Sequence, residues 1–158
     1  MGVGKSTVGR RLAARLSLPF FDADHEIEVA ARMSIPEIFE KFGEAHFRDG
    51  ERRVIARLAA GPPSVIATGG GAFMDEGTRA LILERATAVW IDADIDTLVD
   101  RVRRRDNRPL LKGKDPAEVL RALAAVRNPI YAEAPIRVVS RQVPHEAMVE
   151  AILEALTR

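Results

Sequence analysis

The chain has 158 residues, of which 47% are hydrophobic and 30% charged, with a net charge of +1 and no cysteine. These values fit one soluble globular domain in a reducing compartment, and they exclude disulfide scaffolds and thiolate metal sites. A nearly neutral chain without an apolar run of roughly 18 residues gives no reason to expect nucleic acid or a membrane as partner. We therefore expect a cytoplasmic protein.

The first element is a glycine-rich sequence made of Gly2, Val3, Gly4, Lys5, Ser6 and Thr7. It matches the second half of the phosphate-binding pattern G-x-x-x-x-G-K-[ST], although a glycine-rich turn at a frayed N-terminus is the alternative. In such loops the backbone N–H groups cradle phosphates, Lys5 would reach the β- and γ-phosphates, and Ser6 would ligate Mg²⁺. Apolar residues follow at helical spacing, so the loop leads into a helix N-terminus, which favours anions.

The first glycine of that pattern would lie two residues upstream of Met1, and no strand precedes the loop. In this fold class the missing strand is usually internal to the sheet. We expect the functional protein to extend upstream by about 8–15 residues, enough for a strand and the missing glycine.

Short apolar runs then alternate with amphipathic stretches. Strands are predicted at residues 19–21, 65–68, 88–91 and 136–139. Helices are predicted at 6–16, 26–32, 35–42, 51–58, 78–84, 95–105, 118–126 and 145–156, the third of them starting at a capping box at Ser34. Strands that alternate with helices indicate an α/β fold with a parallel sheet. The charged residues 106–116, with one glycine and two prolines, are predicted to form a mobile loop.

Two carboxylates, Asp22 and Asp24, follow the strand predicted at 19–21. Strand alternation would place both on the same side, near the carboxyl end of the sheet, where ligands bind in open α/β sheets. Beside a phosphate loop they could order Mg²⁺ and its waters or accept a proton from an attacking hydroxyl. In the alternative interpretation Asp24 caps the next helix and Asp22 forms a turn.

Residues 43–51 are predicted to join two helical segments. Arg48 within them is suited to a bidentate grip on a carboxylate, or else it pairs weakly at the surface with Asp49 or Glu51. A second arginine, Arg127, could meet Arg48 across the cleft, the alternative being charge compensation at a helix C-terminus. His46 has no triad or metal partners and is expected to be a spectator.

Three consecutive glycines follow the strand at 65–68, namely Gly69, Gly70 and Gly71. They would let the backbone approach a substrate closely, although a simple strand-to-helix turn is the alternative. Residues 101–114 are rich in arginine and lysine, and most of these side chains are expected to face solvent. Arg108 differs because it opens a loop that can close over ATP and place a guanidinium on the transferring phosphate.

Over nearly its whole length the chain resembles the shikimate kinases, small monomeric members of the nucleoside-monophosphate-kinase-like P-loop family. The resemblance is carried by GVGKST, Asp-x-Asp, GEAHFRDGE, GGG, RPLL and R-x-P-x-Y in this order. It implies a three-layer P-loop kinase fold with a central parallel sheet flanked by helices, and one domain over residues 1–158. Within it, a substrate-binding segment would span about 24–51 and a mobile lid about 106–116. It also implies that ATP, with Mg²⁺, phosphorylates the 3-hydroxyl of shikimate in aromatic amino-acid synthesis.

For the nucleotide, the resemblance assigns the phosphates to Lys5 and the backbone around it, and Mg²⁺ to Ser6 and, through water, Asp22. Arg108 would be the lid arginine, while Arg101 would pack on adenine with Pro144 on its other face. Lys5, Asp24 and Arg108 would be the catalytic residues.

For the acid, the resemblance assigns the shikimate hydroxyls to Asp24, which would orient or deprotonate the nucleophile. Arg48 and Arg127 would clamp the carboxylate, Glu51 would support Arg48, and the three glycines would line the site. Two such arginines suit a small carboxylic acid better than a nucleoside acceptor. A gluconate-type sugar-acid kinase and an inactive nucleotide-binding homologue remain as alternative functions.

Overall fold

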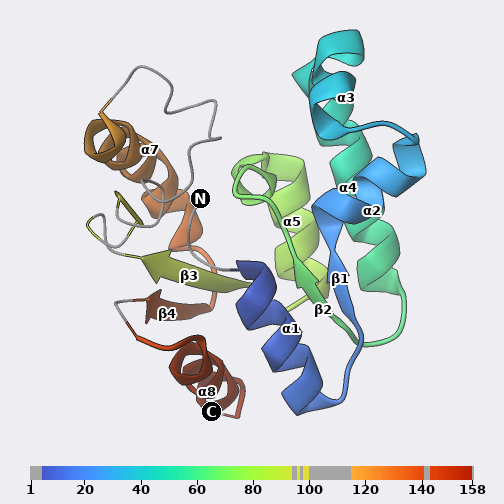
Figure 1. Cartoon of the computed structure of the whole chain (residues 1–158). Helices are drawn as coiled ribbons and strands as arrows, with labels where there is room; N and C mark the ends of the chain where they lie inside the picture. The colour runs from blue at the N-terminus through green and yellow to red at the C-terminus, as the bar shows by residue number, and fades with distance from the viewer. Residues whose placement is uncertain (1–4, 94–95, 97, 100–114, 141–142, 158) are drawn as a thin grey trace. The chain divides into compact units, whose positions relative to one another are not determined.

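The computed structural model describes residues 5–93, 96, 98–99, 115–140 and 143–157 (Figure 1). The chain forms two compact units, one over residues 5–87 and the other containing residues 88–158. Each unit is described by itself below. Among the described residues, none of the helices is long and apolar enough to cross a membrane.

The first unit combines two short strands with five α-helices among its described residues. In chain order these elements and a 3-10 turn are α1 (Lys5–Leu16), β1 (Phe20–Asp22), α2 (Ala23–Ala31), α3 (Ile35–Phe42), α4 (Glu44–Ala60), β2 (Val65–Ala67), η1 (Ala72–Met74) and α5 (Glu76–Arg85). The strands are parallel, with Phe20 opposite Val65 and Asp22 opposite Ala67. Both strands therefore end at the same edge, where α2 and the glycines after β2 begin.

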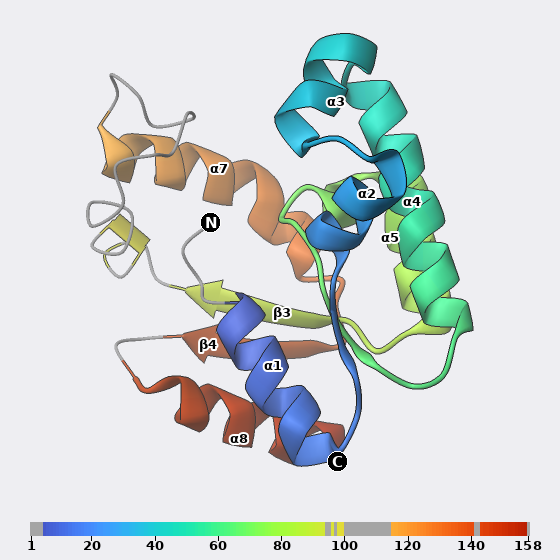
Figure 2. The same cartoon turned by 45° about the vertical axis from the view of Figure 1, so that its right-hand side comes forward.

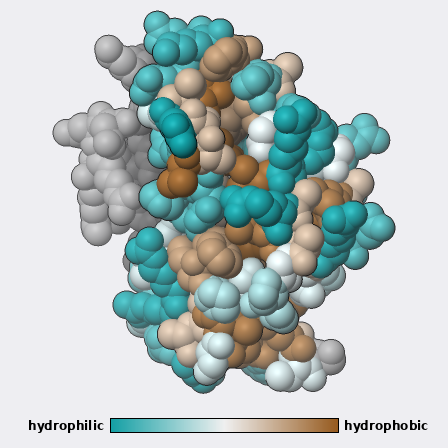
Figure 3. Space-filling view, turned by 90° about the vertical axis from the view of Figure 1, so that its right-hand side faces the viewer, coloured by the Kyte–Doolittle hydropathy of each residue, from teal (hydrophilic) through white to brown (hydrophobic). Residues whose placement is uncertain are grey.

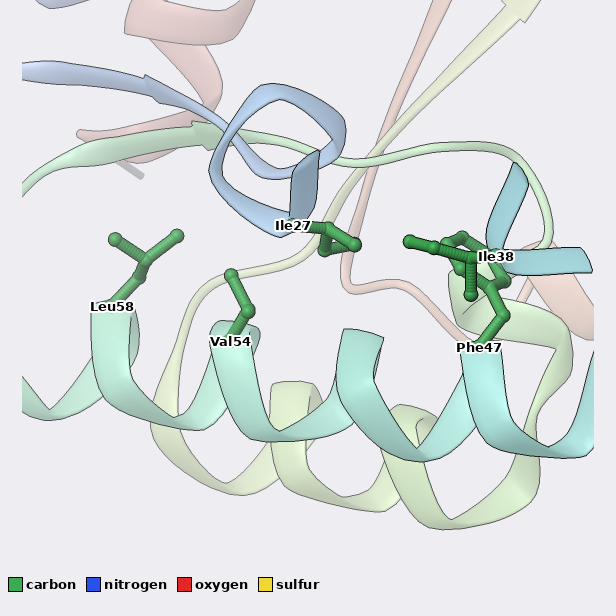
Figure 4. Close-up of a cluster of buried hydrophobic side chains, with 5 residues drawn as sticks. All are labelled: Ile27, Ile38, Phe47, Val54 and Leu58. Atoms are coloured by element: carbon green, nitrogen blue, oxygen red, sulfur yellow. The ribbon is translucent and has the colours of Figure 1, made fainter. Parts of the chain in front are cut away.

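The core of this unit lies between α2, α3 and α4. Figure 4 shows five buried side chains that converge there, Ile27, Ile38, Phe47, Val54 and Leu58. A second cluster of Ala23, Ile55 and Ala72 packs on Ile66 of β2. Figure 3 shows that apolar side chains also reach the surface of one face of the molecule, among hydrophilic ones. Because the apolar faces of α2 and α4 pack in these clusters, both helices are held beside β2.

The second unit contains β3 (Val89–Ala93), α7 (Pro116–Tyr131), β4 (Ile136–Ser140) and α8 (His145–Leu156). The strands are parallel, with Trp90 opposite Arg137 and Asp92 opposite Val139. Figure 2 shows α7 and α8 on opposite sides of this pair. The buried residues of α8 are Met148, Val149 and Ile152.

The predicted strands are confirmed to within two residues, and the helix and capping box at 35–42 are confirmed as predicted. In the described part of the chain the four strands pair two by two, β1 with β2 and β3 with β4. Residues 106–114 of the predicted loop and most of the helix predicted at 95–105 lie outside the described residues, as do Gly2, Val3 and Gly4. The last two residues of that loop were predicted wrongly, because Asp115 caps α7 and Pro116 is its first residue.

A second prediction of secondary structure was wrong. Residues 44–51 do not join two helices but form the first half of α4, which starts at Glu44 after the N-cap Gly43. Gly43, with φ of 84° and ψ of 175°, is the single residue between α3 and α4, and its backbone conformation ends the first helix and starts the second. Phe47 then packs into the core, so that burial compensates for the weak apolar periodicity of this segment.

Candidate active site

The start of α1 is tied to both strands of the first unit. The Lys5 ammonium donates a hydrogen bond to the backbone carbonyl of Thr68, directly after β2, at 2.8 Å. The Ser6 hydroxyl donates to Asp22 Oδ2 at 3.3 Å. Thr7, the last residue of the glycine-rich sequence, is exposed. These contacts bring the cation and the hydroxyl to the edge where both strands end.

Asp22 has three hydrogen-bond partners at this edge. Besides Ser6 it accepts hydrogen bonds from the backbone N–H groups of Asp24 at 3.0 Å and His25 at 3.5 Å, and so it caps α2. The alternative in which Asp24 is the cap is therefore wrong, because α2 begins at Ala23 and Asp24 lies within its first turn. The two carboxylates are close together through this turn rather than through strand alternation.

Asp24 lies among charged groups of three elements. Burial raises the pKa of its carboxyl, and the nearby Asp22 raises it further, whereas Lys5 and Arg48 lower it. A Cβ placed on Gly69 would lie 3.2 Å from Asp24 Oδ1, so the carboxylate is packed against that glycine. This half-buried carboxylate is therefore close enough to Lys5 and Arg48 for both cations to favour its ionised form.

Arg48 is held by a buried carboxylate on its own helix. Its Nη1 donates to Glu51 Oε1 at 2.8 Å, and the Glu51 side chain is only 2% exposed. Burial raises the pKa of Glu51, and the hydrogen bond from Arg48 opposes that rise. The expectation that Glu51 supports Arg48 is confirmed, and the alternative of a weak surface pair is wrong because the carboxylate is buried.

The three glycines after β2 make room for these side chains. A Cβ on Gly71 would lie within 2.7 Å of Arg48 Nη1 and 2.8 Å of Cζ. Gly69 and Gly71 thus accommodate Asp24 and Arg48, a role that we did not predict from the sequence. Gly71 has a φ of −82°, so the closeness of the guanidinium, and not the backbone conformation, requires glycine there.

We did not predict from the sequence a contact between α4 and the start of α5, a few residues after the glycines. Asp75 caps α5 by accepting from Thr78 N at 2.9 Å, and it lies 3.5 Å from Arg52 of α4. Arg52 follows Arg48 by one turn, and it also contacts Asp49 at 3.1 Å. The aspartate three residues before Thr78 is a capping signal that could have been recognised.

The remaining predicted residues belong to the second unit or lie outside the described residues. Arg127 is half-buried in α7, and its side chain is hydrogen-bonded to Tyr131, whose pKa is raised by burial. Pro144 is exposed and occupies the N-cap position of α8 without a side-chain cap hydrogen bond. Arg101 and Arg108 lie outside the described residues. That Arg48 and Arg127 together bind the carboxylate of a substrate therefore stays a prediction.

Comparisons with known proteins agree on one family. The family model described as shikimate kinase matches residues 1–157. A shikimate kinase of Caulobacter vibrioides is 62% identical over 156 residues, which cover 99% of this chain and 78% of that protein. One of Bradyrhizobium diazoefficiens is 59% identical, with 99% of this chain and 75% of that protein covered.

Solved structures give the same result. The shikimate kinase from Acinetobacter baumannii, solved in complex with shikimate, matches with a TM-score of 0.90 and 38% identity over 99% of this chain and 88% of that one. The shikimate kinase from Aquifex aeolicus matches with a TM-score of 0.86 and 39% identity over 99% and 92% of the two chains. The predicted α/β P-loop kinase fold is confirmed by these neighbours.

Proposed function

The chain belongs to the shikimate kinase family, and on that premise we propose that it transfers the γ-phosphoryl group of ATP to the 3-hydroxyl of shikimate. It is an ATP-dependent kinase of aromatic amino-acid biosynthesis. The observation that carries the assignment of roles is the place of Asp24, half-buried between Lys5 and Arg48 and packed against Gly69.

Asp24 orients the acceptor hydroxyl and takes its proton as the new O–P bond forms. Phosphoryl transfer depends on in-line positioning and on neutralising the phosphate charge, and little covalent work falls to the protein. The raised pKa of Asp24 makes it a better proton acceptor than an exposed aspartate. Lys5 supplies positive charge at the phosphates, from a position fixed by Thr68.

Mg²⁺ fits the donor set at Ser6 and Asp22. A hydroxyl and a carboxylate 3.3 Å apart are the oxygen ligands that this cation takes together with waters and substrate phosphates. When bound, the cation neutralises developing charge on the phosphates.

The substrate carboxylate binds Arg48 and Arg127, and Gly69–Gly71 line the site. Arg48 is presented by Glu51, which holds its Nη1, while its Nε lies 3.7 Å from Glu44 Oε1, so Nη2 is the nitrogen that we assign to the ligand. On the nucleotide side we assign the phosphates to Gly2, Val3, Gly4 and Thr7 beside Lys5. Adenine goes to Arg101 and Pro144, and Arg108 is assigned to the lid. The enzyme acts as a cytoplasmic monomer on small molecules, without nucleic acid or membrane.

The test is shikimate-dependent release of ADP by the purified chain with Mg²⁺, compared with its Asp24→Asn variant. We expect the variant to lose about 10²–10⁴-fold in kcat while ATP binding is retained, because only the proton acceptor is removed. Glu76→Gln, at an exposed carboxylate of α5, is the control and should keep full activity.

Three results would contradict the proposal. Asp24→Asn with more than about a tenth of the wild-type kcat would remove the role of Asp24. Faster turnover of gluconate than of shikimate would identify a sugar-acid kinase instead. ATP binding without ADP release with either acid would identify an inactive homologue.

A further inference from the structure

The chain contains a single tyrosine and a single tryptophan, and the two rings contact each other. Trp90 lies in β3 and Tyr131 is the last residue of α7. Their ring centroids are 5.9 Å apart, with the planes inclined by 48°. Both residues are half-buried. Neither has a part in the function proposed above.

Tyr131 contacts Arg127, which does have a part in the proposed function. Arg127 and Tyr131 are four residues apart in α7, a spacing that places side chains on one helix face. The Tyr131 hydroxyl accepts a hydrogen bond from the Arg127 guanidinium. The ordinary pKa of a tyrosine is 10.0 and burial raises that of Tyr131, so the phenol is neutral at pH 7 and places no negative charge beside Arg127.

The turn that joins these two residues lacks one backbone hydrogen bond of a regular helix. Pro129 lies between them inside α7 and has no N–H to donate to the carbonyl four residues before it. The contact of the Tyr131 ring with Trp90 fastens this weakened turn to β3.

Trp90 is itself braced from the neighbouring strand. The Arg137 guanidinium lies over its ring, with Cζ 5.1 Å from the centroid. Arg137 is in turn bonded to Asp92, two residues after Trp90 on β3. A contact chain thus runs from the β3–β4 pair through Trp90 and Tyr131 to Arg127.

We propose that Tyr131 is a positioning residue that fixes the Arg127 guanidinium for the carboxylate of the substrate and connects it to Trp90. The inference rests on the proposed role of Arg127. Tyr131 orients the cation without neutralising it, so the full charge of Arg127 remains available to an anionic ligand. Binding of the acid at Arg127 then changes the surroundings of Trp90.

The test uses Tyr131→Phe, which removes the hydroxyl and keeps the ring against Trp90. We expect the KM for shikimate to rise about threefold to tenfold, the effect of one hydrogen bond, with kcat and the KM for ATP nearly unchanged. Arg127→Ala should raise the same KM roughly tenfold to a hundredfold. In the double variant the KM should equal that of Arg127→Ala, because the hydroxyl acts only through the guanidinium.

Each other outcome has a distinct meaning. If Arg127→Ala leaves the KM for shikimate unchanged, the proposed role of Arg127 fails and this inference fails with it. If Arg127→Ala raises the KM but Tyr131→Phe does not, only the inference fails. The inference also fails if Tyr131→Phe lowers kcat and the melting temperature but leaves the KM for shikimate unchanged. It fails likewise if the double variant shows the full sum of the two single effects on that KM. Arg121→Ala, at an exposed arginine of the same helix, is the control and should change neither constant.

A second measurement needs no variant that could fail to fold. The emission of Trp90, the single tryptophan, is followed while shikimate is titrated into the wild-type protein. A saturable change with a midpoint near the KM supports the connection to Arg127. Unchanged emission at saturating shikimate would overturn it.

Discussion

Two arginines of this enzyme are held by different chemical groups. Arg48 donates to the buried carboxylate of Glu51, whereas Arg127 donates to the neutral hydroxyl of Tyr131. A carboxylate partner compensates the charge of the arginine and makes a strong bond, while a hydroxyl orients the cation and leaves its charge in place. If both residues bind the acid, as we propose, we therefore expect their contributions to differ.

Gly71 gives a test of the position of Arg48. In Gly71→Ala the new methyl group would lie within 2.7 Å of Arg48 Nη1, so the guanidinium must move. Because φ is −82°, alanine fits the backbone, and the melting temperature should change little. We expect the KM for shikimate to rise about tenfold, as for the loss of one charge-assisted contact. Steady-state kinetics decide it. Gly61→Ala, where a Cβ makes only ordinary contacts, is the control, and an equal KM in the two variants would contradict the placement of Arg48.

Tyr131 gives a test of the electrostatics of Arg127. Burial raises the pKa of Tyr131 above its ordinary value of 10.0, and Arg127 lowers it. The native state therefore keeps its proton to higher pH than the unfolded chain does, and the free energy of unfolding falls as pH rises through this range. In Arg127→Ala the pKa should rise further. Tyrosinate absorbance measures it directly because the chain has one tyrosine, and a lower pKa in the variant would contradict the hydrogen bond.

At the scale of elements, α4 carries Arg48, which we propose for the carboxylate of the acid, and its partner Glu51. Its first two turns hold Arg48 and Glu51 on the face towards the glycines, while Phe47 packs into the core. The helix has no side-chain cap and begins directly after Gly43. The backbone of that one glycine therefore sets the direction in which α4 leaves α3.

Gly43→Ala should destabilise the protein without any steric clash. A φ of 84° with a ψ of 175° is a conformation almost confined to glycine, and a Cβ there would meet no atom within 4 Å. We expect the free energy of unfolding to fall by about 1–3 kcal/mol, measured by urea denaturation.

Gly50→Ala is the matched control for that experiment. It also places a methyl group in open space, but within the helix α4. Helix propensity should make it more stable by about 1 kcal/mol. Equal stability of the two variants would show that the backbone of Gly43 carries no special cost.

At the scale of the whole molecule, two compact units share one chain. The prediction of one domain over residues 1–158 implies that both units respond to the same ligand.

Calorimetry tests that prediction. We expect one unfolding transition whose calorimetric and van't Hoff enthalpies agree. Shikimate at about 100 times its Kd should stabilise the whole protein by about 2.7 kcal/mol and raise the melting temperature by several degrees. Two transitions, with only one of them shifted by shikimate, would show that the units unfold independently.

Much of the fold could be predicted from local signals in the sequence. The apolar periods predicted the strands and most helices, and Ser34 with Glu37 predicted the start of α3, because caps and amphipathic faces depend on near neighbours in the chain. The order of the six motifs identified the family before any geometry was known.

Only the tertiary structure decided how these residues meet. Phe47 made residues 44–50 helical by entering the core, an effect that no local pattern of that polar segment indicates. The packing of Asp24 on Gly69 and of Arg48 on Gly71 joins residues more than 20 positions apart. Sequence by itself determined which chemical groups this kinase possesses. The packing of α2 and α4 beside β2 determined their distances, because burial and charge act through space and not along the chain.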